Sequence, residues 1–390
     1  MQLQSEFIND HLLTQNSKYK INTLMLSKKN KSVMNSQLRN ILDKMKRSFM
    51  SDLKIVALQP INLKKMQNIF VNFDKTLNEI SSSKFQNDII EMDKIHSVKL
   101  ETKHGDIVLN FLSNGKKNNL IAAVIHSLNT FCNCFPHNYN ELVIDICLDD
   151  NNRNINYDEL QNFTSYDKIF SELKHKSGAF NVSGVTYRHE HNIILTKTEE
   201  LIKLLFHEMI HYVGLDNKLY GKSGNMNLAI SNNLNLSEAY TEFMSVLLYV
   251  AYHSIHYSGI NKNTNIYDYF CEIFRLETEY SSYLASNILK FYGFDSKTFK
   301  NFFTEKNEKI YCPIPIWEYV FFRTQLMLKI SSVCECVGNS WEIDNTNINQ
   351  IIDLMNFDDF LIEKLSICME KIEPINNLSY LLIDFDWNKI

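Results

Sequence analysis

Glycine and proline are scarce in this chain, with 10 and 5 among 390 residues, where average usage would be about 7% and 5%. Both residues interrupt helices and build tight turns, so their scarcity favours a helix-rich protein and argues against an all-β sandwich. The remaining composition, 45% hydrophobic and 22% charged, is that of a globular protein. It excludes the disordered and collagen-like classes.

Disulfides and membrane spans are not expected either. The eight cysteines are too sparse for a disulfide scaffold of this length. The Cys-x-Cys pairs 132/134 and 334/336 lack the two-residue gap of zinc ribbons, which predicts ordinary buried thiols. The longest apolar run, residues 243–252, is about half a membrane span. Because the first twenty residues contain no signal-peptide pattern, we expect an intracellular, cytoplasmic protein.

Basic charge is concentrated at the beginning of the chain. The net charge is −5, yet residues 1–70 contain 12 Lys and Arg against 4 Asp and Glu. Within residues 35–50, apolar side chains recur at helical spacing and basic side chains occupy the other faces, which predicts a basic amphipathic helix. Such a helix could contact nucleic acid, an acidic partner or a membrane surface. The acidic balance of the whole chain favours instead a helix that packs on the rest of the protein.

Strand-like alternation of apolar and polar residues is confined to the middle of the chain. The segments that alternate, and are therefore predicted as strands, are 98–102, 107–111, 141–148, 184–187 and 192–196. A turn at 103–106 joins the first two into a hairpin. Helical spacing predicts a helix over 120–131, another over 198–213, and almost only helices after residue 237.

This order of elements predicts an α+β protein, with a small mixed sheet before helix 198–213 and a mostly helical C-terminal part. We expect three segments. Residues 1–95 form a basic, helical N-terminal region, residues 96–215 form a lobe that bears the sheet, and residues 216–390 form a helical lobe.

The helix predicted at 198–213 contains the sequence His207-Glu208-Met209-Ile210-His211. Thr196 and Glu199 would form its capping box, and Gly214 would end it. Histidines four residues apart lie on one helix face, where both imidazoles can bind one metal ion. Because this helix is apolar on most of its circumference, two core histidines without such a partner would carry a desolvation cost of several kcal/mol.

A catalytic zinc takes a third protein ligand and keeps an open position. Asn217 occupies the place where a metzincin has its third ligand, which disfavours that family. Asp216 is an alternative ligand, although it follows the helix end so closely that reaching the metal would be awkward. Glu238 is preferred, at the start of the next predicted helix. Glu242 shares its face, and a zinc on Glu238 would relieve their repulsion while Glu242 accepts the far N–H of a ligand histidine.

The HExxH sequence followed some 25 residues later by Ser-Glu-Ala-Tyr-Thr-Glu (237–242) resembles the gluzincin group of zinc metallopeptidases. The resemblance implies a zincin-like catalytic domain with Zn²⁺ on His207, His211 and Glu238, supported by Glu242. Residues 177–187 are also similar to the edge strand that aminopeptidases of this group place beside the substrate. The exopeptidase glutamate of that strand is missing here, and the nearest acid is Glu190.

These residues together predict a zinc-dependent peptidase that cleaves peptides or proteins, with endopeptidase action preferred. Glu208 would act as general base and acid on a water at the metal. A tetrahedral oxyanion needs a donor, for which Tyr280, Tyr292 and Tyr311 are candidates. The substrate would add as an extended strand along residues 178–187.

Three other functions remain open from the sequence. A zinc-stabilised interaction protein without turnover could use the same ligands, although it would have no need of a general base such as Glu208. An aminopeptidase of similar fold is the second alternative. The third is a protein that binds nucleic acid or a membrane surface through residues 18–65, which a salt dependence of binding would reveal.

Overall fold

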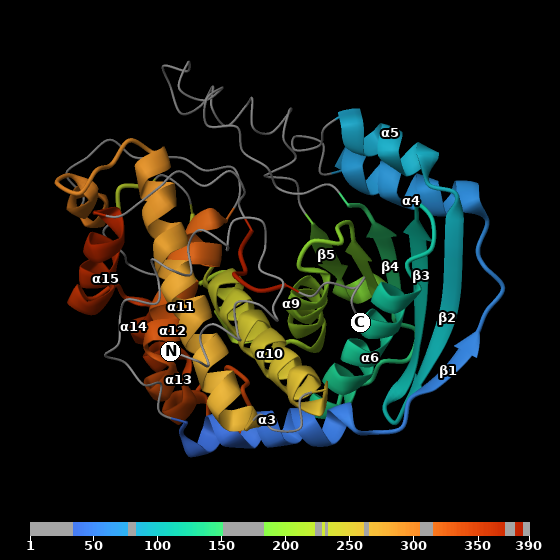
Figure 1. Cartoon of the computed structure of the whole chain (residues 1–390), viewed down its shortest axis with the longest axis horizontal. Helices are drawn as coiled ribbons and strands as arrows, with labels where there is room; N and C mark the ends of the chain where they lie inside the picture. Colours follow the sequence, from blue (N-terminus) through green and yellow to red (C-terminus); the bar gives the residue numbers. More distant parts are fainter. Residues whose placement is uncertain are drawn as a thin grey trace.

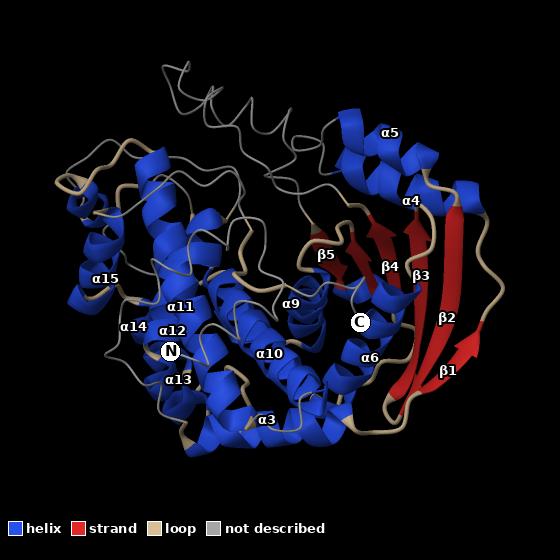
Figure 2. Ribbon diagram, viewed as in Figure 1, coloured by secondary structure: helices blue, strands red, loops and turns tan. Residues whose placement is uncertain are grey.

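The computed structural model describes residues 34–76, 83–150, 183–222, 228–230, 233–260, 265–304, 315–370 and 379–384. The fold is mixed α+β, with a small mixed sheet and a mostly helical C-terminal part, as the sequence predicts (Figure 2). All strands of the described residues precede the helix that carries His207 and His211. The division into three segments remains a prediction, and one hydrophobic core joins residues from all three.

Within the described residues, six strands form one sheet in the order β1-β2-β3-β4-β6-β5. Their bounds are β1 Lys54–Ala57, β2 Lys94–Thr102, β3 Gly105–Ser113, β4 Val143–Leu148, β5 Gly184–Tyr187 and β6 Asn192–Leu195. β3, β4 and β6 run parallel, whereas β1, β2 and β5 pair antiparallel with their neighbours. β5 is therefore an edge strand of the described sheet, and its outer edge pairs with no described strand.

The predicted hairpin is confirmed, because β2 and β3 pair from Thr102↔Gly105 onwards. Gly105 is required at this turn, since its φ is +130° and a Cβ there would lie 2.6 Å from the backbone nitrogen of Asn140. The interpretation of residues 1–95 as helical was wrong in one respect, because β1 extends the sheet beside β2. All four of its side chains are exposed, so the strand has no alternation of apolar and polar residues that could reveal it.

Helices cover both faces of the sheet (Figure 1). α4 (Leu63–Thr76) and α5 (Ser83–Glu91) cover one face over a small apolar cluster. α6 (Asn118–Cys134) and α9 (Leu201–Val213) belong to the larger core on the other face. Short 3-10 turns follow β5 and α9, at Arg188–Glu190 (η1) and Asn217–Leu219 (η2). This arrangement buries α9 between the sheet and the helical part of the chain.

The helical part begins with α10, which packs against α9. Its elements are α10 Leu236–Ile260, α11 Ile266–Phe291, η3 Phe299–Phe303, the π-helical turn η4 Trp317–Phe322, α12 Arg323–Leu328, α13 Ile330–Val337, α14 Ile348–Met355 and α15 Asp359–Met369. No helix in the described part of the chain is both long and apolar enough to cross a membrane. The seven cysteines among the described residues are all free thiols.

The basic amphipathic helix is α3 (Ser36–Phe49), and it lies along one end of the molecule (Figure 1). Its apolar side is buried in the main core, and two of its basic side chains rest on aromatic rings of the body. Arg39 lies 4.5 Å from the ring of Tyr267, and Lys44 lies 5.1 Å from that of Phe135. The helix therefore packs on the rest of the protein. Residues 18–33 of the predicted binding region lie outside the described residues.

The predicted start of α9 was wrong. The helix begins at Leu201, and Glu200 precedes it in a left-handed conformation with φ 59° and no side-chain cap. Thr196 therefore forms no capping box. The carboxylate of Asp384 accepts the backbone N–H of Glu200 at 2.8 Å, so a residue near the end of the chain supports this helix start. The predicted helix end is confirmed, since Gly214 follows Val213 with φ 83°.

Residues 379–384 form a short, largely buried segment without helix or strand, which we call the C-terminal segment. Glu277 of α11 accepts the backbone N–H groups of Leu382 and Ile383 at 2.9 and 3.0 Å. The hydroxyl of Tyr280 donates to the carbonyl of Ser379 at 2.7 Å. In Figure 1 this segment is the short red stretch that passes between the helical part and the start of α9.

Glu277 makes the attachment of this segment depend on pH. Burial raises the pKa of Glu277 to about 8, so the folded protein holds a proton that the unfolded chain releases above about pH 4.5. Protonated Glu277 therefore contributes to the free energy of unfolding, by on the order of a few kcal/mol. This contribution is complete below about pH 4.5 and is lost as the pH rises through 8. Glu277→Gln should remove this loss, so its melting temperature relative to wild type should rise between pH 5 and pH 9. Glu272→Gln, on the same helix but more exposed, is the control and should track wild type.

Candidate metal centre

The structure brings His207 and His211 of α9 together with Glu238 of α10. Their ligand atoms all lie within 4.8 Å of one another. The Nε2 atoms of the two histidines are 3.2 Å apart. The Glu238 carboxylate lies 3.3 Å from Nε2 of His207 and 3.5 Å from Nε2 of His211. The helix spacing of the histidines and the packing of α10 on α9 produce this convergence.

Each histidine has a carboxylate on its other ring nitrogen. Nδ1 of His207 lies 3.0 Å from Oε2 of Glu242, and Nδ1 of His211 lies 2.7 Å from Oδ2 of Asp216. A carboxylate in this position accepts a hydrogen bond from Nδ1–H, which keeps the proton on Nδ1 and the lone pair on Nε2. Both Nε2 lone pairs then point at each other and at the carboxylate of Glu238.

Three acceptor groups that face one another in a largely buried place could hold a cation. Glu238 Oε2 is buried and has no hydrogen-bond partner among the described residues. A tetrahedral zinc with bonds of about 2.0–2.2 Å would separate its nitrogen and oxygen ligands by roughly 3.3–3.5 Å. The two Nε2 atoms are 3.2 Å apart, and each lies 3.3–3.5 Å from one oxygen of Glu238, His207 from Oε2 and His211 from Oε1, which is close to this separation. The donor set therefore fits a zinc ion.

Glu208 lies beside this cluster and is fixed by the edge strand β5. The hydroxyl of Thr186 donates to Oε2 of Glu208 at 2.7 Å. Gly184 leaves the space that the carboxylate fills, since a Cβ there would lie 2.7 Å from Oε1 of Glu208. Burial raises the pKa of Glu208, against the lowering effect of His207, His211 and Thr186. A carboxylate with a raised pKa next to a metal site suits general base chemistry.

Cationic side chains lie against the two carboxylates that face the histidine Nδ1 atoms, those of Glu242 and Asp216. Oε1 of Glu242 lies 2.5 Å from Nζ of Lys203 and 3.1 Å from the guanidinium of Arg323, both of which are buried. The guanidinium of Arg188 lies 4.0 Å from Oδ1 of Asp216. Glu208 and Glu238 are left as the negative charges that a divalent ion would balance.

Two of the three tyrosines predicted as oxyanion donors, Tyr280 and Tyr292, are not brought to the cluster. The hydroxyl of Tyr280 donates to Ser379, and Tyr292 packs against Trp317 at 5.2 Å between ring centroids. Tyr311 lies outside the described residues. The aromatic side chain next to the cluster is that of Tyr319, whose ring meets His207 edge to face at 5.7 Å. Tyr319 belongs to the π-helical turn η4, a rare element that is frequent at functional sites.

Sequence reasoning missed two features of this site. Asp216 was weighed only as a direct ligand, whereas the structure places it on the outer nitrogen of His211. The signal was present, because Gly214 turns the chain back at the helix end and brings the acid two residues later against that ring. Tyr319 had no comparable signal, since more than a hundred residues separate it from His207.

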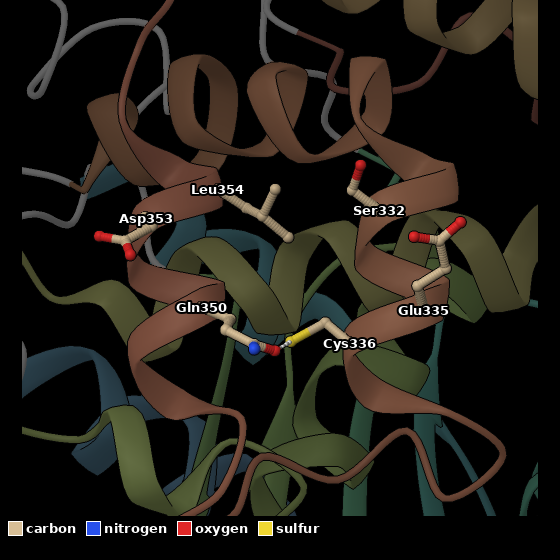
Figure 3. A pocket seen from close by; sticks show the side chains of 6 residues that line it. All are labelled: Ser332, Glu335, Cys336, Gln350, Asp353 and Leu354. Atoms are coloured by element: carbon tan, nitrogen blue, oxygen red, sulfur yellow. Dashed lines mark hydrogen bonds between the residues drawn. The ribbon is translucent and has the colours of Figure 1, made fainter.

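A separate hollow lies between α13 and α14 (Figure 3). It has a volume of about 450 Å³ and contains none of the residues of the candidate metal centre. Its lining residues are Ser332, Glu335, Cys336, Gln350, Asp353 and Leu354. The thiol of Cys336 donates to Oε1 of Gln350 at 3.3 Å across it. It offers no histidine and no cluster of ligands, so it does not compete with the site on α9 and α10.

Comparison with known proteins finds a viral relative. The chain is 40% identical over 385 residues to an uncharacterized protein of Acanthamoeba polyphaga mimivirus, and the match covers 98% of this chain and 99% of the relative. No protein-family model matches the chain. No solved structure matches it either.

Proposed function

The chain belongs to the same family as this mimivirus protein, and we propose that it is a zinc-dependent metallopeptidase. The observation that carries the proposal is the convergence of His207, His211 and Glu238 beside Glu208. A structural zinc site would be closed by a fourth protein ligand. The described residues supply three ligands and a separate carboxylate that is held in place by Thr186.

In the proposed reaction, a bound zinc would polarise the scissile carbonyl and lower the pKa of a water towards about 7. Glu208 takes a proton from the attacking water at its carboxylate and passes it to the leaving amine. Thr186 keeps this carboxylate in one rotamer during both transfers. Glu242 and Asp216 hold the imidazoles so that both Nε2 lone pairs face the metal.

Tyr319 is the proposed donor to the oxyanion. Its ring lies against that of His207, edge to face. Burial raises the pKa of Tyr319, with Glu238, Glu208 and Glu242 adding to the effect. The hydroxyl therefore stays protonated and able to donate at neutral pH.

The substrate is proposed to add as an extended strand to the outer edge of β5. β5 lies against α9, and its residues Gly184 and Thr186 contact Glu208, so a peptide on this edge would pass the metal. The fold is on this view zincin-like, with the sheet and α9 on one side of the substrate and the helical part on the other.

Endopeptidase action is preferred over aminopeptidase action. An aminopeptidase needs a carboxylate that binds the free α-amino group, and β5 contains none. Glu190 lies exposed in the turn after this strand. The residue that directly follows β5 is Arg188, whose guanidinium reaches towards Asp216. A cation there would repel an ammonium group.

The test uses an internally quenched peptide in N-acetylated and free-amine forms. We expect cleavage of both at similar rates, and loss of cleavage after a chelator removes the metal. A strong preference for the free amine would reverse the assignment in favour of an aminopeptidase. A wild-type protein that binds zinc but cleaves no peptide in a diverse library would support a zinc-stabilised interaction protein instead.

A further inference from the structure

Arg323 is a buried charged residue that has no part in the proposed reaction. Its side chain is 1% exposed and lies at the start of α12. The guanidinium donates to Oε1 of Glu242 at 3.1 Å, to the hydroxyl of Ser281 at 2.9 Å and to the carbonyl of Tyr380 at 3.1 Å. It thus joins α10, α11 and the C-terminal segment. A guanidinium in such a place costs several kcal/mol unless it is paired and hydrogen-bonded.

The contact with Glu242 links Arg323 to the histidines. One oxygen of Glu242 receives Arg323 and Lys203, and the other faces Nδ1 of His207. The direction of the Glu242 carboxylate therefore sets the rotation of the His207 imidazole. That rotation decides whether Nε2 points at Glu238 or away from it.

Lys203 cannot fix this direction by itself. Its ammonium is a point charge on a flexible stem, and it also lies 3.8 Å from Glu200. Arg323 has a planar group with donors in fixed directions, and two of its contacts, Ser281 and Tyr380, lie on other elements. These contacts lock the guanidinium plane, which in turn locks Glu242.

The C-terminal segment meets the site by a second route. The ring of Tyr380 lies 6.0 Å from that of Tyr319, which in turn meets His207. Nζ of Lys203 lies 5.2 Å from the centre of the Tyr380 ring. Tyr380 of the C-terminal segment thus accepts a hydrogen bond from Arg323 through its carbonyl. Its ring also packs against Tyr319 and Lys203, which lie next to His207 and Glu242.

We propose that Arg323 is a positioning residue of the metal centre, which acts through Glu242 on the orientation of His207 and ties the C-terminal segment to the site. The proposal rests on the metal centre put forward above. It predicts that changes at Arg323 alter metal binding itself, before any peptide is added.

Arg323→Lys keeps the positive charge and removes the planar guanidinium with its fixed donor directions. Arg323→Met removes both the charge and the donors. For each variant, zinc affinity is measured by competition with a chromophoric chelator, and the absorption spectrum of bound Co²⁺ reports the ligand geometry. We expect a 10- to 100-fold loss of zinc affinity, as for other groups that orient metal ligands, and a changed Co²⁺ spectrum. Arg275→Lys is the matched control, because Arg275 of α11 pairs with Glu272 at 2.7 Å and contacts none of these groups.

Circular dichroism first establishes which variants fold. If Arg323→Met does not fold, the zinc affinity and Co²⁺ spectrum of Arg323→Lys alone test the positioning role. An unchanged affinity and Co²⁺ spectrum in folded Arg323→Lys would overturn the positioning role and leave the metal centre standing. A wild-type protein that binds neither Zn²⁺ nor Co²⁺ would overturn both. The two failures are therefore distinguishable.

Discussion

Glu208→Gln is expected to retain zinc and fold while losing peptide hydrolysis by roughly two to four powers of ten. Glutamine has the same shape and can still accept the hydrogen bond from Thr186. It cannot take a proton from the attacking water. The measurement compares the turnover of the quenched peptide by wild type and variant at equal zinc content. Comparable turnover in the variant would refute the assignment of Glu208 as general base.

A second substitution tests the same carboxylate without changing it. Gly184→Ala places a methyl group 2.7 Å from Oε1 and 3.0 Å from Cγ of Glu208, so the side chain must move. We expect turnover to fall with little change in zinc affinity, because Gly184 contacts no proposed ligand. Gly259→Ala is the matched control, since a Cβ at Gly259 meets nothing within 4 Å.

The two outcomes separate catalysis from folding. A melting temperature near that of wild type in Gly184→Ala, together with lost turnover, would show that the position of Glu208 matters and not only its presence. Full activity in Gly184→Ala would mean that the carboxylate tolerates displacement. In that case the contact with β5 would be packing alone.

The histidines and glutamates of the site could be found from the sequence because local spacing brings them together. His207 and His211 are one helical turn apart, and so are Glu238 and Glu242. The hairpin β2–β3 was predictable for the same reason, since a turn joins two alternating segments directly. Such contacts depend on residues that are close in the chain.

The remaining parts of the site depend on contacts that no local pattern encodes. Arg323 reaches Glu242 across 81 residues, and Asp384 supports the start of α9 across 184. The capping box predicted at Thr196 failed because the hydroxyl of Thr196 donates to the carbonyl of Ser183 and the helix begins only at Leu201. β1 was missed because its side chains face solvent on both sides, so only its pairing with β2 identifies it.

One zinc ion per chain is expected. Substitution of the three proposed ligands should lower the zinc affinity to different extents. His207→Ala and His211→Ala should abolish stoichiometric zinc, because each removes one of two nitrogens that converge within 3.2 Å. Glu238→Ala should weaken binding and leave two histidines on the ion. Elemental analysis after dialysis, followed by chelator competition, measures the difference.

Asp216→Ala distinguishes a ligand from a support. Its carboxylate faces Nδ1 of His211 at 2.7 Å, so the ion should remain bound with affinity lowered about 10- to 100-fold. The order of loss should therefore be the histidines first, then Glu238, then Asp216. Full zinc retention in Glu238→Ala, with loss in Asp216→Ala, would exchange the two roles. It would also require the His211 ring to turn over, because a carboxylate on Nδ1 cannot share an ion with Nε2 of the same ring.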